Sequence, residues 1–505
     1  MNAEEIIRGK KLITCSNTLI LRFCLYGFLK NQKYFEPFLI VILQQWGLSL
    51  TTIGFLISIE KITCYLMELP SGYLSDRYGA RTTLCSCFLL YIISFICYYF
   101  GKQEHILFLV MASFFYGLAE AMRSGAHKSM VFMWLEKHKL ESLKSYLNGF
   151  TRTFSLLGSA TAAIAGIFFA LYLDADRNLF LCAIPPYIID LCIVGSYPSY
   201  MNTNLSNDAL SSTTSSAATD PTNPTNTEKK KKKKKKKKSG KSGGFCRDMQ
   251  SLLVVMKQPA QRRVVLTTAA VGVIHRVFKD FVQPIVLQNA WAIESTFEST
   301  FTGNGNSTVP GVGAPPPRTT NDTQVVILGI SYFIFYLASS PASQNAYRLP
   351  SLFGTKEKKI MDGLLDSYTV ALMLIALTLY AAVPVVVPFI YVTLYVIYNF
   401  SKPLSASAIS DVAGKRLRAT VFSADAALQT LLVAGLAPLA GFVADVSLPN
   451  MFLLFSVVLL VLNRMFFAEA SILAVCCATT EKERIDVVVE ADMGEGGEKG
   501  AELEL

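Results

Sequence analysis

The chain has 505 residues, of which 52% are apolar and only 17% are charged, and its mean hydropathy is positive. These proportions exclude a soluble domain with an ordinary polar surface and indicate a membrane protein that crosses the bilayer several times. The formal net charge of +10 comes from ten consecutive lysines, Lys229–Lys238, since 10 − 10 leaves zero, so no nucleic-acid-binding surface is expected.

The N-terminal half begins with a polar segment, residues 1–16, which we expect to be cytoplasmic and not a cleaved leader. Six apolar runs follow within residues 17–201, each long enough to cross a bilayer core of about 30 Å. They fall near 17–45, 51–71, 82–101, 105–135, 145–173 and 179–199. The sequence therefore predicts a bundle of six transmembrane helices.

A short polar loop, predicted between the second and third runs, carries a recognisable motif. Its marked positions are Gly72, Asp76, Arg77, Gly79 and Arg81. They resemble the cytoplasmic signature of the major facilitator superfamily, G-x-x-x-D-[RK]-x-G-[RK]-[RK], from which the chain departs at Ala80. Gly79 permits a backbone turn that side chains resist, and Asp76 can accept hydrogen bonds from a neighbouring helix N-terminus. We expect a gating loop that stabilises one conformational state.

Residues 202–250 are rich in Ser, Thr, Asn, Pro and Lys, and they contain the run Lys229–Lys238. Such a segment cannot bury enough apolar surface to fold. We predict a disordered cytoplasmic linker between two halves. Its lysines either bind anionic lipid headgroups or form a solvated spacer without a partner.

The C-terminal half, residues 251–478, carries six further apolar runs. They fall near 262–291, 324–346, 361–385, 387–412, 419–444 and 450–475. The loop 292–323 contains acceptor triplets at Asn306 and Asn321, which predict glycosylation of an extracytoplasmic loop. Residues 479–505 are acidic, and we expect them to form a disordered tail.

Lysine and arginine residues concentrate on one side of the predicted spans. The positive-inside rule makes that side cytoplasmic, and an even number of spans places both termini there. We expect the protein in the plasma membrane or an endomembrane, acting as a monomer.

The family resemblance implies an all-α membrane protein with twelve transmembrane helices in two six-helix, pseudo-symmetric bundles, the major facilitator fold. It also implies alternating access around a central cavity lined by the first, fourth, seventh and tenth helices. A short internal sequence similarity supports two related halves. Tyr34-Phe-Glu-Pro37 in the first run is similar to Phe281-Val-Gln-Pro284 in the seventh.

Ionisable side chains inside a membrane are costly and usually face a cavity or a partner, which makes them candidates for binding substrate or protons. Three predicted helices concentrate them: Lys30, Lys33 and Glu36 in the first, Glu120, Arg123 and His127 in the fourth, and His275, Arg276, Lys279 and Asp280 in the seventh. Lys30 and Lys33 have the spacing to share one helical face.

Each candidate also has a purely structural interpretation, as a member of the ion pairs Glu36–Lys33, Glu120–Arg123 or Asp280–Arg276. Basic groups outnumber acidic ones on these faces, which favours an anionic or zwitterionic substrate. The group around Glu120 is the predicted proton-coupling site, because a carboxylate beside a cation can change its proton affinity as a cavity is wetted and dried.

We therefore expect a secondary active transporter that moves a small solute by alternating access, coupled to a proton or another ion. Proton-coupled drug or xenobiotic efflux is one alternative, and a non-transporting receptor or scaffold on the same fold is another. We expect no enzyme activity, cofactor or metal, because the four histidines are scattered along the chain.

Overall fold

The computed structural model describes residues 17–139, 144–173, 177–198, 259–288, 322–354 and 357–464. The predicted terminal segments, the linker with its lysine run, and both glycosylation candidates, Asn306 and Asn321, lie outside the described residues. The domain boundaries, the lipid contacts of the lysines and glycosylation therefore stay predictions.

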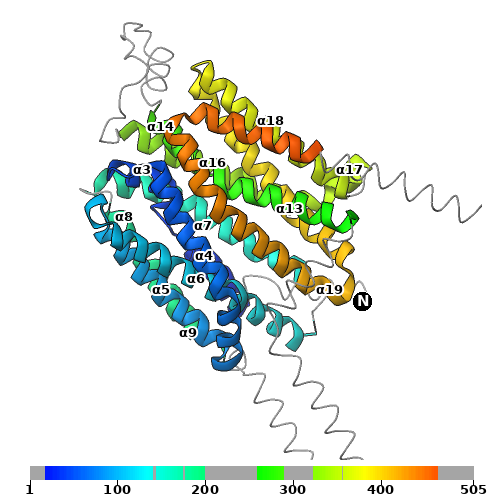
Figure 1. The fold of residues 1–505 in the computed structure, drawn as a ribbon. Helices are drawn as coiled ribbons and strands as arrows, with labels where there is room; N and C mark the ends of the chain where they lie inside the picture. Colours follow the sequence, from blue (N-terminus) through cyan, green and yellow to red (C-terminus); the bar gives the residue numbers. More distant parts are fainter. Residues whose placement is uncertain are drawn as a thin grey trace, which may run out of the picture.

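The helices of the first half lie together on one side of the molecule, coloured blue to cyan-green in Figure 1. They are α2 (Thr18–Leu29), η1 (Glu36–Phe38), α3 (Leu39–Gln45), α4 (Leu50–Tyr78), α5 (Ala80–Phe100), η2 (Gln103–His105), α6 (Ile106–Lys137), α7 (Lys144–Tyr172), α8 (Asn178–Cys182) and α9 (Ile184–Gly195). Each of the six predicted runs coincides with one of these helices or with two or three in succession.

The helices of the second half, coloured green to orange-red, form the other side of the molecule (Figure 1). They are α13 (Pro259–Phe278), α14 (Val282–Gln288), α16 (Asp322–Asn345), η6 (Ala346–Arg348), α17 (Leu349–Phe353), α18 (Glu357–Tyr380), η7 (Pro384–Val386), α19 (Val387–Val446) and a last helix, Leu448–Arg464. The six predicted runs of this half again fall on helices wherever they are described.

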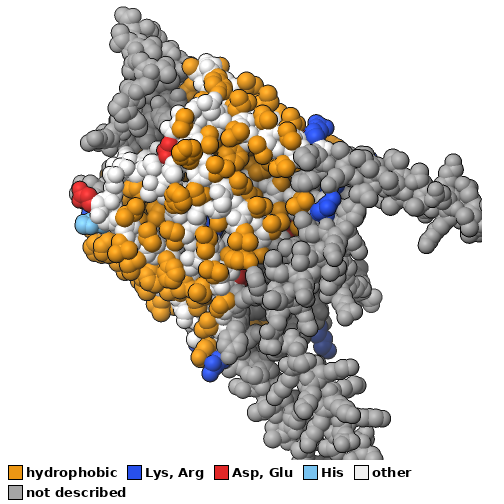
Figure 2. Space-filling view, in the orientation of Figure 1, with side chains coloured by type: hydrophobic (Ala, Val, Ile, Leu, Met, Phe, Trp, Pro, Cys, Tyr) orange, Lys and Arg blue, Asp and Glu red, His pale blue; other side chains and the backbone are white. Residues whose placement is uncertain are grey.

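The outer surface of the bundle is suited to lipid. Within the described residues, nine helical segments are long and apolar enough to cross a membrane. Apolar side chains cover the face shown in Figure 2, where charged side chains appear mainly towards its edges. Phe55, Phe389 and Phe442 each leave more than half of their surface exposed. Exposure of this kind is unfavourable in water and favourable among acyl chains, so the predicted all-α membrane protein is confirmed.

The first predicted run is a broken helix. Between α2 and η1 the chain leaves the helical path, and polar side chains replace the lost backbone bonds. Asn31 Nδ2 donates to a carbonyl oxygen of α2 at 2.8 Å, and Gln32 Nε2 donates to one of α7 at 3.1 Å. Such a break is tolerated in a membrane only inside protein or beside water. The predicted common helical face of Lys30 and Lys33 is wrong, because both residues follow the end of α2.

The segment predicted as a gating loop is mostly helical. α4 continues through the motif as far as Tyr78, and α5 begins at Ala80. Gly79 alone joins them, with a φ of +92°. This value lies where glycine is favoured, so the predicted reason for a glycine here is confirmed. Gly72 and the side chain of Asp76 lie outside the described part.

Although its backbone is helical throughout, α19 reverses direction and holds two predicted spans. A straight helix of its 60 residues would be about 90 Å long. Tyr391 donates to the carbonyl oxygen of Phe278 at the end of α13, and Ala408 packs against residues near the start of α13. Asp425 then accepts from Thr268 in the middle of the same helix. Both arms of α19 therefore run along α13, in opposite directions.

The two halves meet along α4 and the second arm of α19, which lie side by side in Figure 1. Leu50 N and Thr51 N donate to the two carboxylate oxygens of Asp445, each at 2.8 Å. Farther along α4, Ser58 Oγ donates to the carbonyl oxygen of Ala434 at 2.6 Å. We refer to the part of the bundle around Leu50 and Asp445 as the Leu50 end, and to the opposite part around Gly79 as the Gly79 end.

Glycines allow this close approach, which leads to a test. A Cβ atom at Gly54 would lie 2.5 Å from the carbonyl oxygen of Ala437, so the Gly54→Ala substitution must push α4 and α19 apart. Thermal unfolding of the purified protein should show a loss of roughly 1–3 kcal/mol. Gly435→Ala is the matched control, because the added Cβ would have no atom within 4 Å apart from the backbone of its own helical turns and its chain neighbours. Equal effects of the two substitutions would contradict tight packing at Gly54.

Candidate substrate and proton site

Glu120 and Arg123, one turn apart on α6, form an ion pair completed by a tyrosine. Arg123 Nη2 donates to Glu120 Oε2 at 2.5 Å, and the hydroxyl group of Tyr91 on α5 donates to Oε1 at 2.6 Å. Arg123 Nε donates to the same hydroxyl oxygen at 3.2 Å. The two charged side chains are 23% and 26% exposed although they lie between helices. The carboxylate is therefore well stabilised while water or a solute can still reach it.

Lys30 and Lys33 place two further cations beside this pair. The ammonium group of Lys33 is hydrogen-bonded to the hydroxyl group of Tyr116 and lies 4.9 Å from the centre of its ring. That of Lys30 lies 5.3 Å from the ring centre of Tyr26. Neither ammonium group forms an ion pair within the described residues. The predicted Glu36–Lys33 ion pair is wrong, because Glu36 pairs with the other half instead.

Glu36 joins the two halves through Lys279. The Lys279 ammonium group lies 3.1 Å from Glu36 Oε1 and 3.3 Å from Asp280 Oδ2. Tyr332 donates to the other oxygen of Asp280 at 2.9 Å. Among the described residues Asp280 makes no ion pair with Arg276, so that prediction is wrong. Since α13 ends at Phe278, the helical spacing that supported it does not extend to Asp280.

The two similar sequence segments, residues 34–37 and 281–284, meet at this interface. Gln283, at the position equivalent to Glu36, donates through Nε2 to the carbonyl oxygen of Glu36 at 3.0 Å. Its Oε1 accepts from Ile40 N at 2.7 Å. The first segment lies between α2 and α3, and the second follows the break after α13 and forms the start of α14. The unpaired backbone groups of one half are therefore satisfied by the equivalent residue of the other half.

Both candidate histidines are packed among aromatic rings. His127 stacks on Tyr26 with ring centres 3.9 Å apart. His275 stacks on Tyr398 at 3.7 Å, and its Nδ1 is 3.0 Å from the hydroxyl oxygen of Tyr368. His275 is also almost fully buried. These contacts fix the orientation of the imidazole rings, and a role in proton coupling stays a prediction.

Asp190 on α9 is a charged residue that the analysis of the sequence did not single out. The residue is 0% exposed, and neither carboxylate oxygen has a hydrogen-bond partner within the described residues. Lys30 is the cation that interacts with it electrostatically, while Tyr26 and Cys87 also lie within electrostatic range. An aspartate within the apolar stretch of the sixth run was a signal for this site.

The basic residues of the gating motif differ in their contacts. Arg81 Nη1 donates to the carbonyl oxygen of Tyr197 at 3.0 Å, which ties the start of α5 to the chain that follows α9. The guanidinium group of Arg77 lies 5.4 Å from the ring centre of the neighbouring Tyr78. Only Arg81 therefore has a described role in holding helices together, and gating by this motif stays a proposal.

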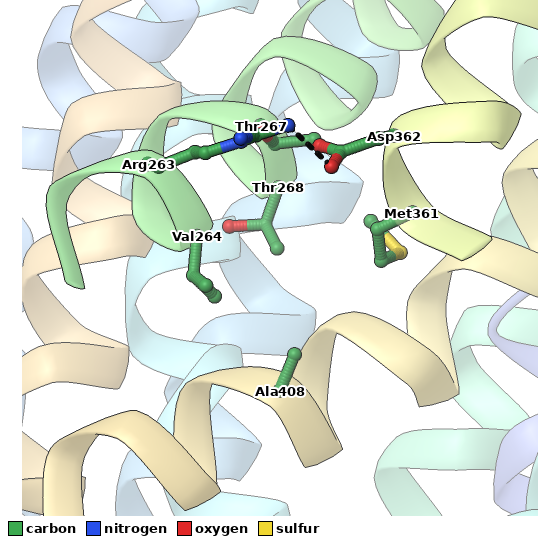
Figure 3. A pocket seen from close by; sticks show the side chains of 7 residues that line it. All are labelled: Arg263, Val264, Thr267, Thr268, Met361, Asp362 and Ala408. Carbon is green, nitrogen blue, oxygen red and sulfur yellow. Dashed lines mark hydrogen bonds and ion pairs between the residues drawn. The ribbon is translucent and has the colours of Figure 1, made fainter. Parts of the chain in front are cut away.

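A small pocket elsewhere, between α13, α18 and α19, is lined by Arg263, Val264, Thr267, Thr268, Met361, Asp362 and Ala408 (Figure 3). Arg263 Nη2 and Asp362 Oδ2 are 2.6 Å apart, and both side chains are almost buried. This ion pair joins α13 to α18 and, unlike the Glu120–Arg123 pair, has little surface for a solute to contact. We interpret it as structural.

Comparison with known proteins decides the family. A family model described as the Major Facilitator Superfamily matches residues 19–438. The chain belongs to the major facilitator superfamily. It is therefore a secondary transporter and not an enzyme, and its partners are a small-molecule solute and the lipid bilayer. This confirms the resemblance that the Gly72–Arg81 motif carried.

Solved structures share the transporter's fold at low sequence identity. A variant of the nucleoside transporter NupG has a TM-score of 0.63 at 12% identity, over 89% of this chain and 98% of that one. A D-xylose–proton symporter has a TM-score of 0.52 at 14% identity, over 87% and 95%. A POT family transporter in complex with 5-aminolevulinic acid has a TM-score of 0.51 at 15% identity, over 88% and 93%. Among curated proteins no match was found.

Proposed function

We propose that this transporter moves a small organic anion or zwitterion by alternating access. The observation that carries the proposal is that two lysines beside Glu120 have no ion-pair partner among the described residues. Lys30 and Lys33 make aromatic contacts and no ion pair within the described residues, while Glu120 is already matched by Arg123. Because uncompensated charges in a membrane interior are costly, an anionic group of a solute would be bound favourably there.

The contacts between the halves support alternating access. Opening the cavity towards the Leu50 end requires α4 and α19 to separate, which breaks the hydrogen bonds of Leu50 and Thr51 to Asp445. It also requires the Glu36–Lys279 ion pair to open. The side chains of Glu36 and Lys279 are 29% and 26% exposed, and Asp445 is exposed, so water can replace their lost partners at modest cost. We infer that they act as a reversible latch.

Two carboxylates support coupling to protons. Glu120 accepts hydrogen bonds from Arg123 and Tyr91, which favours its ionised form in this conformation. Asp190 is buried and has no hydrogen-bond donor among the described residues, which favours its neutral form. A movement that brings water or the Lys30 ammonium group to Asp190 would reverse that preference, so a proton would be bound in one state and released in the other.

Proton-coupled efflux of drugs and a receptor role on the same fold remain the competing functions. An efflux transporter of cationic drugs would need several uncompensated acidic groups in its interior. Asp190 is one acidic residue without a hydrogen-bond partner among the described residues, whereas Lys30 and Lys33 beside Glu120 are two basic residues without an ion pair there. A receptor without transport would not need a latch that water can open. The charge balance around Glu120 therefore favours transport of an anion or zwitterion.

A ligand-induced thermal shift tests the substrate class, because a ligand that binds the folded protein raises its melting temperature. The detergent-purified protein is compared with Lys33→Gln against organic anions, zwitterions including 5-aminolevulinic acid, nucleosides, sugars and cations. Lys102→Gln, which removes an exposed charge, is the matched control. An anion or zwitterion that stabilises the wild type and the control more than Lys33→Gln supports the proposal. Stabilisation by cations or sugars alone, equal in all three proteins, contradicts it.

The gating motif gives a separate prediction. Asp76→Asn should slow turnover more than it weakens binding, because the motif would stabilise one conformational state and contact no solute. Turnover is measured by exchange in proteoliposomes once a substrate has been found, and binding by thermal shift. A variant with unchanged turnover would exclude this role for Asp76.

A further inference from the structure

Three cations from three helices converge around Tyr398, some distance from the Glu120–Arg123 pair. The Lys402 ammonium group lies 4.8 Å from the centre of the Tyr398 ring. Arg152 Nη2, on α7, donates to Asn399 Oδ1 at 2.7 Å, one residue along α19. Arg276, on α13, lies within electrostatic range of both Tyr398 and Lys402, as does Arg152. We call Arg152, Arg276 and Lys402 the Tyr398 cluster.

No carboxylate forms an ion pair with the Tyr398 cluster within the described residues. Asp425 is the acidic group that interacts electrostatically with Arg276. Its oxygens, however, accept from Thr268 at 3.3 Å and from Gln429 at 2.7 Å. At most one of the three positive charges is offset by Asp425, so the cluster keeps an excess of positive charge.

The cluster also has an unused hydrogen-bond donor. Arg152 Nε is buried and has no hydrogen-bond partner among the described residues, although Nη2 of the same guanidinium group is bonded to Asn399. A guanidinium group offers parallel donors whose spacing matches the two oxygens of a carboxylate or a phosphate. Tyr398, which lies within electrostatic range of Arg152, stacks on His275 with ring centres 3.7 Å apart.

We propose that the Tyr398 cluster is an oxyanion subsite that binds a carboxylate or phosphate group of the transported solute. The inference rests on the proposed function, and it adds a second point of contact where α7, α13 and α19 meet, with Arg152 and Arg276 partly buried and Lys402 exposed. Arg152 belongs to the first half, whereas Arg276 and Lys402 belong to the second half. An oxyanion between them attracts both halves, so its binding and release are linked to the relative movement of the halves.

Thermal shift with oxyanion probes tests the subsite. The full-length protein in neutral detergent is titrated with inorganic phosphate and with citrate, and sodium chloride of equal ionic strength is the reference. Arg152→Gln and Lys402→Gln are compared with wild type, and Lys102→Gln is again the matched control. We expect saturable stabilisation of the wild type and the control, with an apparent affinity reduced about tenfold or more in both cluster variants. Arg152→Lys keeps the charge without the planar donors and should give an intermediate affinity.

Several outcomes would overturn the subsite. They also show whether the proposed function fails together with it or still stands. Oxyanions that stabilise wild type, Arg152→Gln and Lys402→Gln equally, but not Lys33→Gln, would exclude the Tyr398 cluster and leave the proposed function standing. No saturable response to any anion or zwitterion would contradict both. Stabilisation by vesicles containing phosphatidylglycerol and not by soluble oxyanions would show that the cluster binds lipid headgroups, which also overturns a solute site.

Discussion

Arg123→Gln should produce the largest loss of both stability and ligand response among single substitutions at the candidate site. The substitution removes the cation that lies 2.5 Å from Glu120 and leaves its carboxylate with the Tyr91 hydroxyl as its described hydrogen-bond donor. Leaving a charged acceptor with too few donors between helices costs about 1–3 kcal/mol or more. The measurement is thermal unfolding of the purified protein, with and without the stabilising anion or zwitterion.

A double substitution separates the structural role of this pair from its role in binding. In Glu120→Gln/Arg123→Gln both charges of the pair are removed together, and both side chains can still form hydrogen bonds. Stability should therefore return towards the wild-type value, while the ligand response should stay reduced if Arg123 contacts the solute. A double variant that regains both would show that the pair is a structural ion pair and that Arg123 does not bind the solute.

Much of the fold could be predicted from the sequence, because the features involved are local. Runs of about 20 apolar residues gave the spans. The spacing of Gly72, Asp76 and Gly79 gave the family, although polar residues were mistaken for a loop where α4 simply continues beyond the apolar run. The hydrogen bonds within a helix form in water as well as in lipid, so a change to polar residues alone does not mark its last residue.

The contacts of the site could be predicted only in part. The Glu120–Arg123 pair lies within one helix, and its helical spacing was sufficient to indicate it. Lys279 pairs with Glu36, which is 243 residues away, and no pattern along the chain specifies that contact. Breaks in the first and seventh runs also moved Lys33 and Asp280 away from the faces that regular helices would have given them.

Arg152 and Asp190 were missed for a different reason. Each is a single charge in an otherwise apolar or weakly polar run, and the candidate helices were chosen because they carried several charges. A residue on its own becomes informative only when its partners are known. Arg152 gains its significance from Lys402 and Arg276, which lie in the other half. Asp190 gains its significance from having no hydrogen-bond donor among the residues that the structure describes.

Asp190→Asn should change how stability depends on pH. Asparagine has the shape of a protonated aspartate and carries no charge at any pH. In the wild type the folded interior favours the neutral carboxylic acid, whereas in the unfolded chain an aspartate ionises above about pH 3.9. The folded state therefore holds more protons than the unfolded state, and its stability falls as the pH rises, by up to about 1.36 kcal/mol per pH unit. The variant should lack this contribution.

The expected result is that wild type and Asp190→Asn melt at similar temperatures near pH 4 and that the variant melts higher at about pH 8. Among the described residues, the titratable groups that interact with Asp190 are Lys30, Tyr26, Cys87 and Tyr197, and all of them are retained in the variant. Asp322→Asn, at an exposed helix start, is the control and should keep the wild-type dependence. If Asp190→Asn also keeps it, the carboxylate is already ionised in the folded protein.

The same variant then tests coupling, because a group that must gain and lose a proton in each cycle cannot be replaced by one that never does. With a substrate found by thermal shift, Asp190→Asn in proteoliposomes should still exchange solute across the membrane. A proton gradient should no longer drive accumulation of that solute. Gradient-driven accumulation at the wild-type level would remove Asp190 from the coupling mechanism and return the role to Glu120, whose carboxylate would then have to release Arg123 in each cycle.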